Sequence, residues 1–232
     1  ALADGTMSEI NTSPYADSGP REAGRACKTY SHSGRQDALR QMFAPAPFTD
    51  LTGNLQPQPH VFRDDLAPIA RRRGEGVQLV LARWGMPTPP QRLIGKALDE
   101  GVTSIVDTRA PHWRRWHAPA SRCLVPFDSF AQQDPRNADG RRVWFRITDG
   151  RPAFFAGIWT SWTSIRKVED GETTDQLFAI LAADAKGDVA AIEAAMPVVL
   201  TCPSDWRTWL MAPWSEAKLL QRAVSSAILE MA

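Results

Sequence analysis

The sequence has few of the residues that build metal sites and disulfide frameworks. Its 232 residues include three cysteines and four histidines. Cys27, Cys123 and Cys202 are odd in number and widely spaced, which suits a reducing compartment and matches no zinc or disulfide pattern. The histidines also lack the spacing of metal ligands, so we expect neither a metal nor another cofactor.

Long apolar runs and phosphate-binding motifs are missing as well. No stretch approaches the roughly 18 consecutive apolar residues of a membrane-spanning helix, and the first residues lack the basic-then-apolar order of a secretory signal. We therefore expect a cytoplasmic protein without a membrane partner. There is no internal repeat and no glycine-rich phosphate loop of either standard pattern. The net charge of +1 neither requires nor excludes a nucleic-acid partner.

The apolar residues that are present suffice for a sizeable core, since 43% of the chain is hydrophobic. Residues 1–25 are small, polar and turn-rich without an apolar period, which predicts a disordered extension. We expect the ordered domain to span residues 26–232.

Strands dominate the predicted secondary structure. Apolar and β-branched runs predict them at residues 77–83, 102–106, 122–127, 142–148, 153–159, 176–182 and 197–201. Helical spacing predicts short helices at residues 35–43, 187–195, 204–211 and 214–222. The proline-rich segment 44–68 is expected to be an extended, ordered loop. Strands without regular β-α-β alternation indicate an α+β domain built on a curled mixed sheet with a few short helices.

Cys27 stands in the polar segment "ACKTYSHS" rather than in an apolar run. A nucleophilic cysteine needs a thiolate and access, and an exposed polar segment beside Lys28 favours both. The local sequence is equally consistent with a surface thiol of no consequence. Cys123 and Cys202 adjoin apolar strands and are interpreted as structural residues.

The segment "DTRAPHWRRW" at residues 107–116 interleaves arginine with tryptophan. Guanidinium groups pair with phosphates and indole rings accept stacked bases, so this composition suits single-stranded nucleic acid. Composition alone favours the alternative, in which the tryptophans pack on the core and the arginines are solvated. The candidate binding residues are Arg109, His112, Trp113, Arg114 and Arg115. For His112 and His117 we expect a solvated surface position.

Two strand ends carry further candidates. Trp84 follows a predicted strand in "RWGMP", where its ring either stacks on a ligand or packs in the core. The segment "LVPFDSFAQQ" ends a strand with polar side chains, which act either in catalysis or as turn and cap residues. No serine-histidine-aspartate triad can be assembled from the sequence.

Six motifs occur together in one order: "CKTYS", "RWGMP", "VDTRAPHW", "SRCLVPFDSFAQ", "FFAGIWT" and "AMPVVLT". With them, the chain from about Cys27 to Arg222 resembles the SOS-response-associated peptidase (SRAP) family of abasic-site processing proteins. The resemblance implies a single domain with a curled, pseudo-barrel mixed sheet and a positively charged cleft. It also implies single-stranded DNA with abasic sites as the partner, and we expect a monomer.

In that family an N-terminal cysteine attacks the aldehyde of an abasic site through its amine and thiol, giving a thiazolidine crosslink. By this resemblance Cys27 matches the nucleophile, Arg109 matches an arginine that contacts DNA phosphate, and Trp84 matches a tryptophan near the base-stacking surface. The family's peptidase label refers to release of residues ahead of the cysteine, which implies cleavage after Ala26.

The chain departs from the family pattern at three positions that the resemblance implies are catalytic. Asp107 replaces an asparagine, Gln132 replaces a glutamate, and Ile192 or Glu193 stands where a histidine is expected.

The residues before Cys27 are a further departure from the family pattern. Either these residues are removed, or the true start lies further along the chain, or the protein is a degenerate copy. Three hypotheses follow: crosslinking of abasic sites through Cys27, non-covalent binding of single-stranded DNA, and cysteine hydrolysis of an unrelated substrate.

Overall fold

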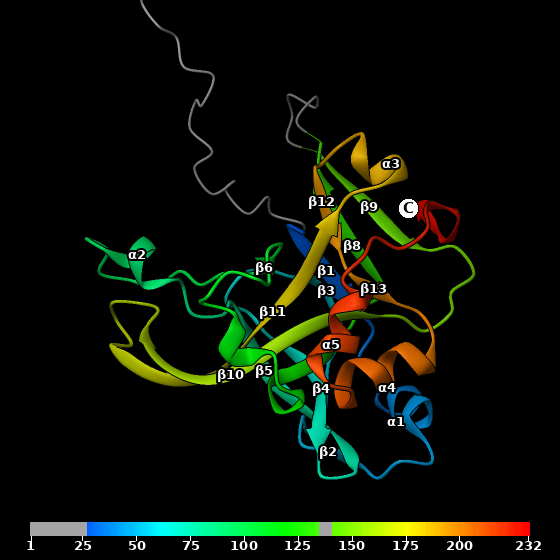
Figure 1. Ribbon diagram of the computed structural model, residues 1–232, viewed down its shortest axis with the longest axis horizontal. Coiled ribbons are helices and arrows are strands. Elements are labelled where there is room, and N and C mark those ends of the chain that lie inside the picture. The colour runs from blue at the N-terminus through cyan, green and yellow to red at the C-terminus, as the bar shows by residue number, and fades with distance from the viewer. Residues whose placement is uncertain (1–26, 135–140) are drawn as a thin grey trace, which may run out of the picture.

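A computed structural model describes residues 27–134 and 141–232 (Figure 1). The strand pairings define a closed barrel of five strands at its centre. The strand order β11-β10-β7-β4-β5 is completed by a parallel pairing of β5 with β11, while the other barrel neighbours are antiparallel. The strands are β4 (Leu66–Arg73), β5 (Gly76–Trp84), β7 (Arg122–Pro126), β10 (Phe154–Ile165) and β11 (Glu172–Asp184). This closure confirms the expected curled mixed sheet of an α+β domain.

Strand β5 shows why these sequences form a barrel with apolar material on both sides. Successive side chains of a strand point to opposite faces. Val80, Ala82 and Trp84 accordingly lie in one buried cluster, while Val77 and Leu79 lie in another. The barrel wall therefore separates two apolar cores.

A second, antiparallel sheet has the order β14-β9-β8-β1-β3. Its strands are β1 (Thr29–His32), β3 (Gln58–Val61), β8 (Ser129–Gln133), β9 (Arg142–Ile147) and β14 (Leu229–Met231). Phe130 and Phe145 pair in register and stack 5.5 Å apart on its inner face. The remaining short strands are β2 (Phe48–Asp50), β6 (Ser104–Ile105), β12 (Ala195–Pro197) and β13 (Val199–Leu200).

The helices are short and lie outside the barrel (Figure 1). They are α1 (Gln36–Phe43), α2 (Pro90–Leu93), α3 (Gly187–Ala190), α4 (Pro203–Met211) and α5 (Trp214–Ala217), with single 3-10 turns at Arg114–Trp116, Pro119–Ser121, Lys218–Leu220 and Ser226–Ile228. Trp209 anchors α4, because its Nε1–H donates to the carbonyl oxygens of Cys123 on β7 (2.9 Å) and Gly157 on β10 (3.2 Å). Among the described residues, no helix is both long and apolar enough to cross a membrane.

The strands predicted at residues 102–106 and 197–201 and the helix predicted at 214–222 are shorter in the structure, and two other predicted elements differ more. The helix expected at residues 187–195 ends at Ala190, because the chain must turn before β12 pairs with β11. The segment 44–68 is not a loop throughout, since β2 pairs with β5 and β3 pairs with β1. The extension predicted at residues 1–25 lies outside the described residues.

Candidate active site

Cys27 lies where the chain enters β1. Thr29 pairs in register with Ala131 of β8, and the N–H of Lys28 also donates to the Ala131 carbonyl (3.0 Å). Lys28 and Thr29 thus both lie opposite Ala131, which is the arrangement of a β-bulge. Cys27 belongs to the buried cluster inside the sheet, is only 2% exposed, and donates its thiol proton to the Thr29 carbonyl oxygen (3.1 Å).

This burial controls the state of the thiol. Desolvation raises the pKa of Cys27 to about 12, and hydrogen bonds with the backbones of Thr29 and Ala131 offset part of that rise. The expectation of an exposed cysteine is therefore wrong. At neutral pH the folded chain holds a protonated thiol rather than a thiolate.

Gln132 is fully buried on β8 and ties this strand to the first residue of β12. Its Nε2–H donates to the carbonyl oxygen of Ala195 (3.2 Å). Ala195 follows Glu193 by two residues, so Gln132 holds the turn that carries Glu193. An amide can hold this position by hydrogen bonding but cannot transfer a proton as a carboxyl group can.

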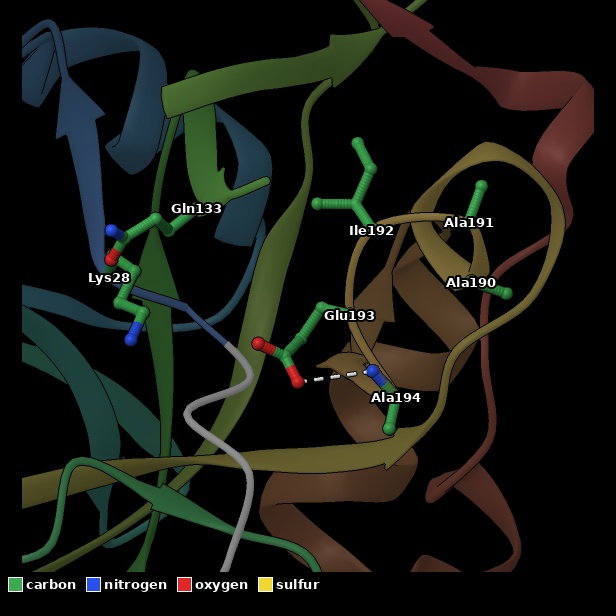
Figure 2. A pocket seen from close by; sticks show the side chains of 7 residues that line it. All are labelled: Lys28, Gln133, Ala190, Ala191, Ile192, Glu193 and Ala194. Atoms are coloured by element: carbon green, nitrogen blue, oxygen red, sulfur yellow. Dashed lines mark hydrogen bonds between the residues drawn. The ribbon is translucent and has the colours of Figure 1, made fainter. Parts of the chain in front are cut away.

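A cavity of about 500 Å³ lies between these segments, lined by Lys28, Gln133 and residues 190–194. Figure 2 shows Lys28 and Gln133 on one side and the turn on the other, with the carboxylate of Glu193 directed into the space between them. Oε1 of Glu193 accepts a hydrogen bond from the N–H of Ala194 (3.1 Å). The structure therefore brings the segments of Cys27, Gln132 and Glu193 together, although they are far apart in sequence.

Asp107 is exposed and is held by Arg109. Its Oδ1 accepts hydrogen bonds from the Nε–H (2.9 Å) and the backbone N–H (3.0 Å) of Arg109. The side-chain hydrogen bond with Arg109 is the main reason that the pKa of Asp107 lies below its usual range. Asp107 is therefore an anion paired with the arginine that was predicted to contact phosphate, whose side chain is 89% exposed.

A C-terminal residue that sequence reasoning missed fixes the segment around Asp107. Nε2 of Gln221 donates to the carbonyl oxygens of Val106 (2.8 Å) and Ala182 (2.9 Å), and its Oε1 accepts from the Thr108 hydroxyl (2.7 Å). No local pattern signals this role, because Gln221 and Thr108 are 113 residues apart.

The histidines expected at a solvated surface are instead partly buried and hydrogen-bonded. Nε2–H of His117 donates to the Thr108 carbonyl (3.0 Å), and its ring stacks on Trp214 at 3.9 Å. Nε2–H of His112 donates to the Pro87 carbonyl (2.9 Å). Desolvation lowers the pKa of both imidazoles, which favours their neutral forms.

The tryptophans predicted to stack on bases lie largely in the core. Trp84 is 1% exposed and donates from Nε1 to the Thr103 carbonyl (3.0 Å), and Trp113 is 7% exposed beside Trp116. This burial does not support a direct stacking role, which stays a prediction. Arg114 and Arg115 are exposed, as a phosphate-binding role requires.

Within residues 27–134 and 141–232, no three histidine, cysteine, aspartate or glutamate side chains are grouped so that they could hold a metal ion. The cavity site combines the buried thiol of Cys27 and the buried amide of Gln132 with two ionisable lining residues, Lys28 and Glu193.

Comparisons with known proteins identify the fold and the family. The family model described as "SOS response associated peptidase (SRAP)" matches residues 25–231. Two solved proteins from Bordetella bronchiseptica, the second described as phage-related, superpose with TM-scores of 0.63 and 0.65. They share 23% and 18% sequence identity with this chain, and the alignments cover 89% of this chain and 98% and 93% of theirs. A protein from Bacteroides thetaiotaomicron gives a TM-score of 0.68 at 18% identity, covering 88% of this chain and 90% of its own. No curated protein sequence matches this chain.

The burial of Cys27 predicts a slow thiol. A rise of its pKa from 9.0 to about 12 lowers the thiolate fraction at pH 8 roughly a thousand-fold. In native protein treated with iodoacetamide, we expect the partly exposed Cys202 to be alkylated first and Cys27 only slowly, as read by peptide mass mapping. Rapid alkylation of Cys27 in the folded chain would contradict the buried geometry, and all three thiols should react alike in urea.

The same shift predicts a dependence of stability on pH. The folded pKa lies above the unfolded value, so the neutral thiol contributes stability that is fully present below about pH 9 and is lost as pH rises toward 12. Above pH 9, the urea unfolding midpoint should therefore fall with rising pH in both proteins. The fall should be less steep in Cys27→Ala than in the parent. An identical slope in the two proteins would contradict this contribution.

Proposed function

The chain belongs to the SOS response associated peptidase (SRAP) family, and we propose that it captures abasic sites in single-stranded DNA through Cys27. The observation that carries the proposal is the position of Cys27, at the entry to β1 beside the cavity between Lys28 and Glu193. Capture requires Cys27 to be the N-terminal residue, because an acylated nitrogen cannot close a thiazolidine.

The proposed reaction balances without a metal or an oxidant. The α-amine of Cys27, with an ordinary pKa near 8, is partly neutral and attacks the aldehyde carbon of the opened abasic sugar. The carbonyl oxygen leaves as water and an imine forms. Sγ then bonds to the imine carbon, the thiol proton passes to the nitrogen, and the thiazolidine ring is closed.

The residues that line the cavity have distinct parts in this proposal. The ionisable lining residues are Lys28 and Glu193, so Glu193 accepts and returns the protons of the addition and dehydration steps. Lys28 places positive charge beside the phosphate of the bound strand. Gln132 acts as a positioning residue, since it holds the turn of Glu193 through Ala195.

A second candidate function is non-covalent binding of single-stranded DNA. The observation that favours it is the combination of a buried Cys27 thiol with a pKa of about 12 and an amide at position 132. Both features reduce the reactivity of Cys27 toward an aldehyde. Neither affects the exposed arginines, which would still bind phosphate.

The test uses one protein in two states. A specific protease site inserted between Ala26 and Cys27 yields an uncut chain and a cut chain that begins at Cys27. We expect the cut chain to form a gel-stable crosslink with an abasic single-stranded oligonucleotide, and intact mass to show the loss of one water. The uncut chain and the cut Cys27→Ser chain should not crosslink.

The same assay separates the two candidates. Crosslinking by the cut chain supports capture, while binding without crosslinking supports the non-covalent function. In that second case Gln132→Glu should raise the crosslinking rate of the cut chain roughly a hundred-fold, because a positioned general acid typically accelerates a reaction by that factor. Gln91→Glu, which adds the same charge on the exposed helix α2 and outside the cavity lining, is the matched control. If neither state of the chain binds or crosslinks DNA, both candidates are refuted.

The ion pair of Asp107 with Arg109 predicts that a charge-neutralising change strengthens DNA binding. Asp107→Asn frees Arg109 for phosphate, so the affinity for single-stranded DNA should rise several-fold and its salt dependence should steepen. Asp149→Asn is a matched control, because Asp149 also pairs with an arginine two residues later, Arg151. Fluorescence anisotropy at two salt concentrations measures both effects, and equal behaviour of the two variants would contradict the prediction.

A further inference from the structure

Four side chains form a cluster on the five-stranded sheet, which we name the aromatic patch: His60, Phe62, Arg142 and Trp144. The His60 ring stacks on Phe62 (centroids 5.9 Å apart) and lies 5.4 Å from the ring of Trp144. The guanidinium of Arg142 lies over the Phe62 ring at 5.2 Å. Residues from the end of β3 and from β9, at least eighty positions apart, thus make one continuous surface.

The strand register places this patch on the outer face of the sheet. On β9, Phe145 and Ile147 are buried in the core, so the alternating residues Arg142 and Trp144 point outward. Val61 at the end of β3 is buried in the same core, which turns His60 and Phe62 outward.

Small residues beneath the patch explain how the rings meet. Thr29 of β1 pairs with Ala131 of β8, and Ala131 pairs with Trp144. Neither Thr29 nor Ala131 is large enough to separate the rings above them. His60 therefore reaches Trp144 across two intervening strands.

The patch is open to solvent and carries positive charge. His60 and Arg142 are exposed, Phe62 is 39% exposed and Trp144 is partly exposed. In the part of the chain that the structure describes, no carboxylate forms an ion pair with Arg142. Exposed aromatic rings under an unpaired guanidinium suit a partner that combines flat rings with negative charge.

The patch continues directly from the cavity beside Cys27. Gln133 lines that cavity and pairs in register with Arg142. Ala131 and Trp144 form the next outward-facing pair, two residues along the strands, which is about 7 Å away. A flexible strand bound at the cavity would thus reach the patch without crossing another element of the sheet.

We propose that the aromatic patch stacks the bases of single-stranded DNA that leads away from the cavity. The inference rests on the proposed function and adds a second contact surface to it. Rings accept any base, because every base has a flat face, and the guanidinium of Arg142 pairs with the adjacent phosphate. The patch therefore contributes affinity without sequence preference.

The test separates base stacking from phosphate binding in the full chain. Fluorescence anisotropy measures the dissociation constants for a labelled oligodeoxythymidylate and for an oligomer of equal length that has the sugar-phosphate backbone but no bases. Phe62→Leu and Trp144→Leu keep apolar volume and remove the rings. We expect each to weaken binding of the thymidylate by about five-fold or more and to leave the base-free oligomer unaffected.

A matched pair of variants tests how much the positive charge of Arg142 contributes to binding. Arg142→Gln should weaken binding of both oligomers, whereas Arg92→Gln, which removes the same charge from the exposed helix α2, should weaken neither to the same extent. Trp144→Phe retains a ring and should restore most of the affinity lost in Trp144→Leu. Unfolding midpoints of all variants distinguish lost contacts from lost folding.

Three results would overturn the proposal. Unchanged thymidylate affinity in both leucine variants refutes the stacking role of the aromatic patch. If the parent still crosslinks abasic DNA in that case, the proposed function stands without the patch. Equal weakening for both oligomers shows that the rings do not stack on bases. A sedimentation coefficient that rises with protein concentration in the parent and not in Trp144→Leu assigns the patch to a second copy of the chain instead.

Discussion

The parallel pairing of β5 with β11 is the interaction on which the rest of the structure depends. It closes the barrel through Leu177 opposite Arg83 and Phe178 opposite Trp84, and the N–H of Gly85 adds a hydrogen bond to the Phe178 carbonyl (2.8 Å). Strand β11 also pairs with β6 and β12. The segment of Asp107 follows β6 and the turn of Glu193 precedes β12, so one strand supports the segments of both surface carboxylates.

Burial divides the candidate site into a neutral interior and a charged rim. Cys27 and Gln132 lie inside, where an ionised group would lose its hydration, and both are neutral at ordinary pH. Asp107 and Glu193 lie at the surface, where water stabilises a carboxylate. The family resemblance implies a glutamate at the interior position, where this chain has Gln132, and a histidine in the turn that carries Glu193.

Local patterns predicted the elements whose side chains alternate or repeat regularly. Val143, Phe145 and Ile147 alternate and form β9, and the helical spacing before Pro45 matches α1. Strands β2 and β3 carry no such signal, because they are short and are held by backbone pairing with strands that are distant in sequence. The burial of Trp84 was equally unpredictable, since a tryptophan at a strand end suits a ligand surface and a core alike.

By itself, the sequence determined the α+β class, most strand positions, the order of the family motifs and the residue types available for chemistry. Those properties depend on short-range periodicity and on side-chain identity, which can be read directly. Only the tertiary structure decided that Cys27 is buried, that Gln132 reaches Ala195 and that His60 meets Trp144. Each of these contacts arises from strand register across a closed sheet, which no single segment encodes.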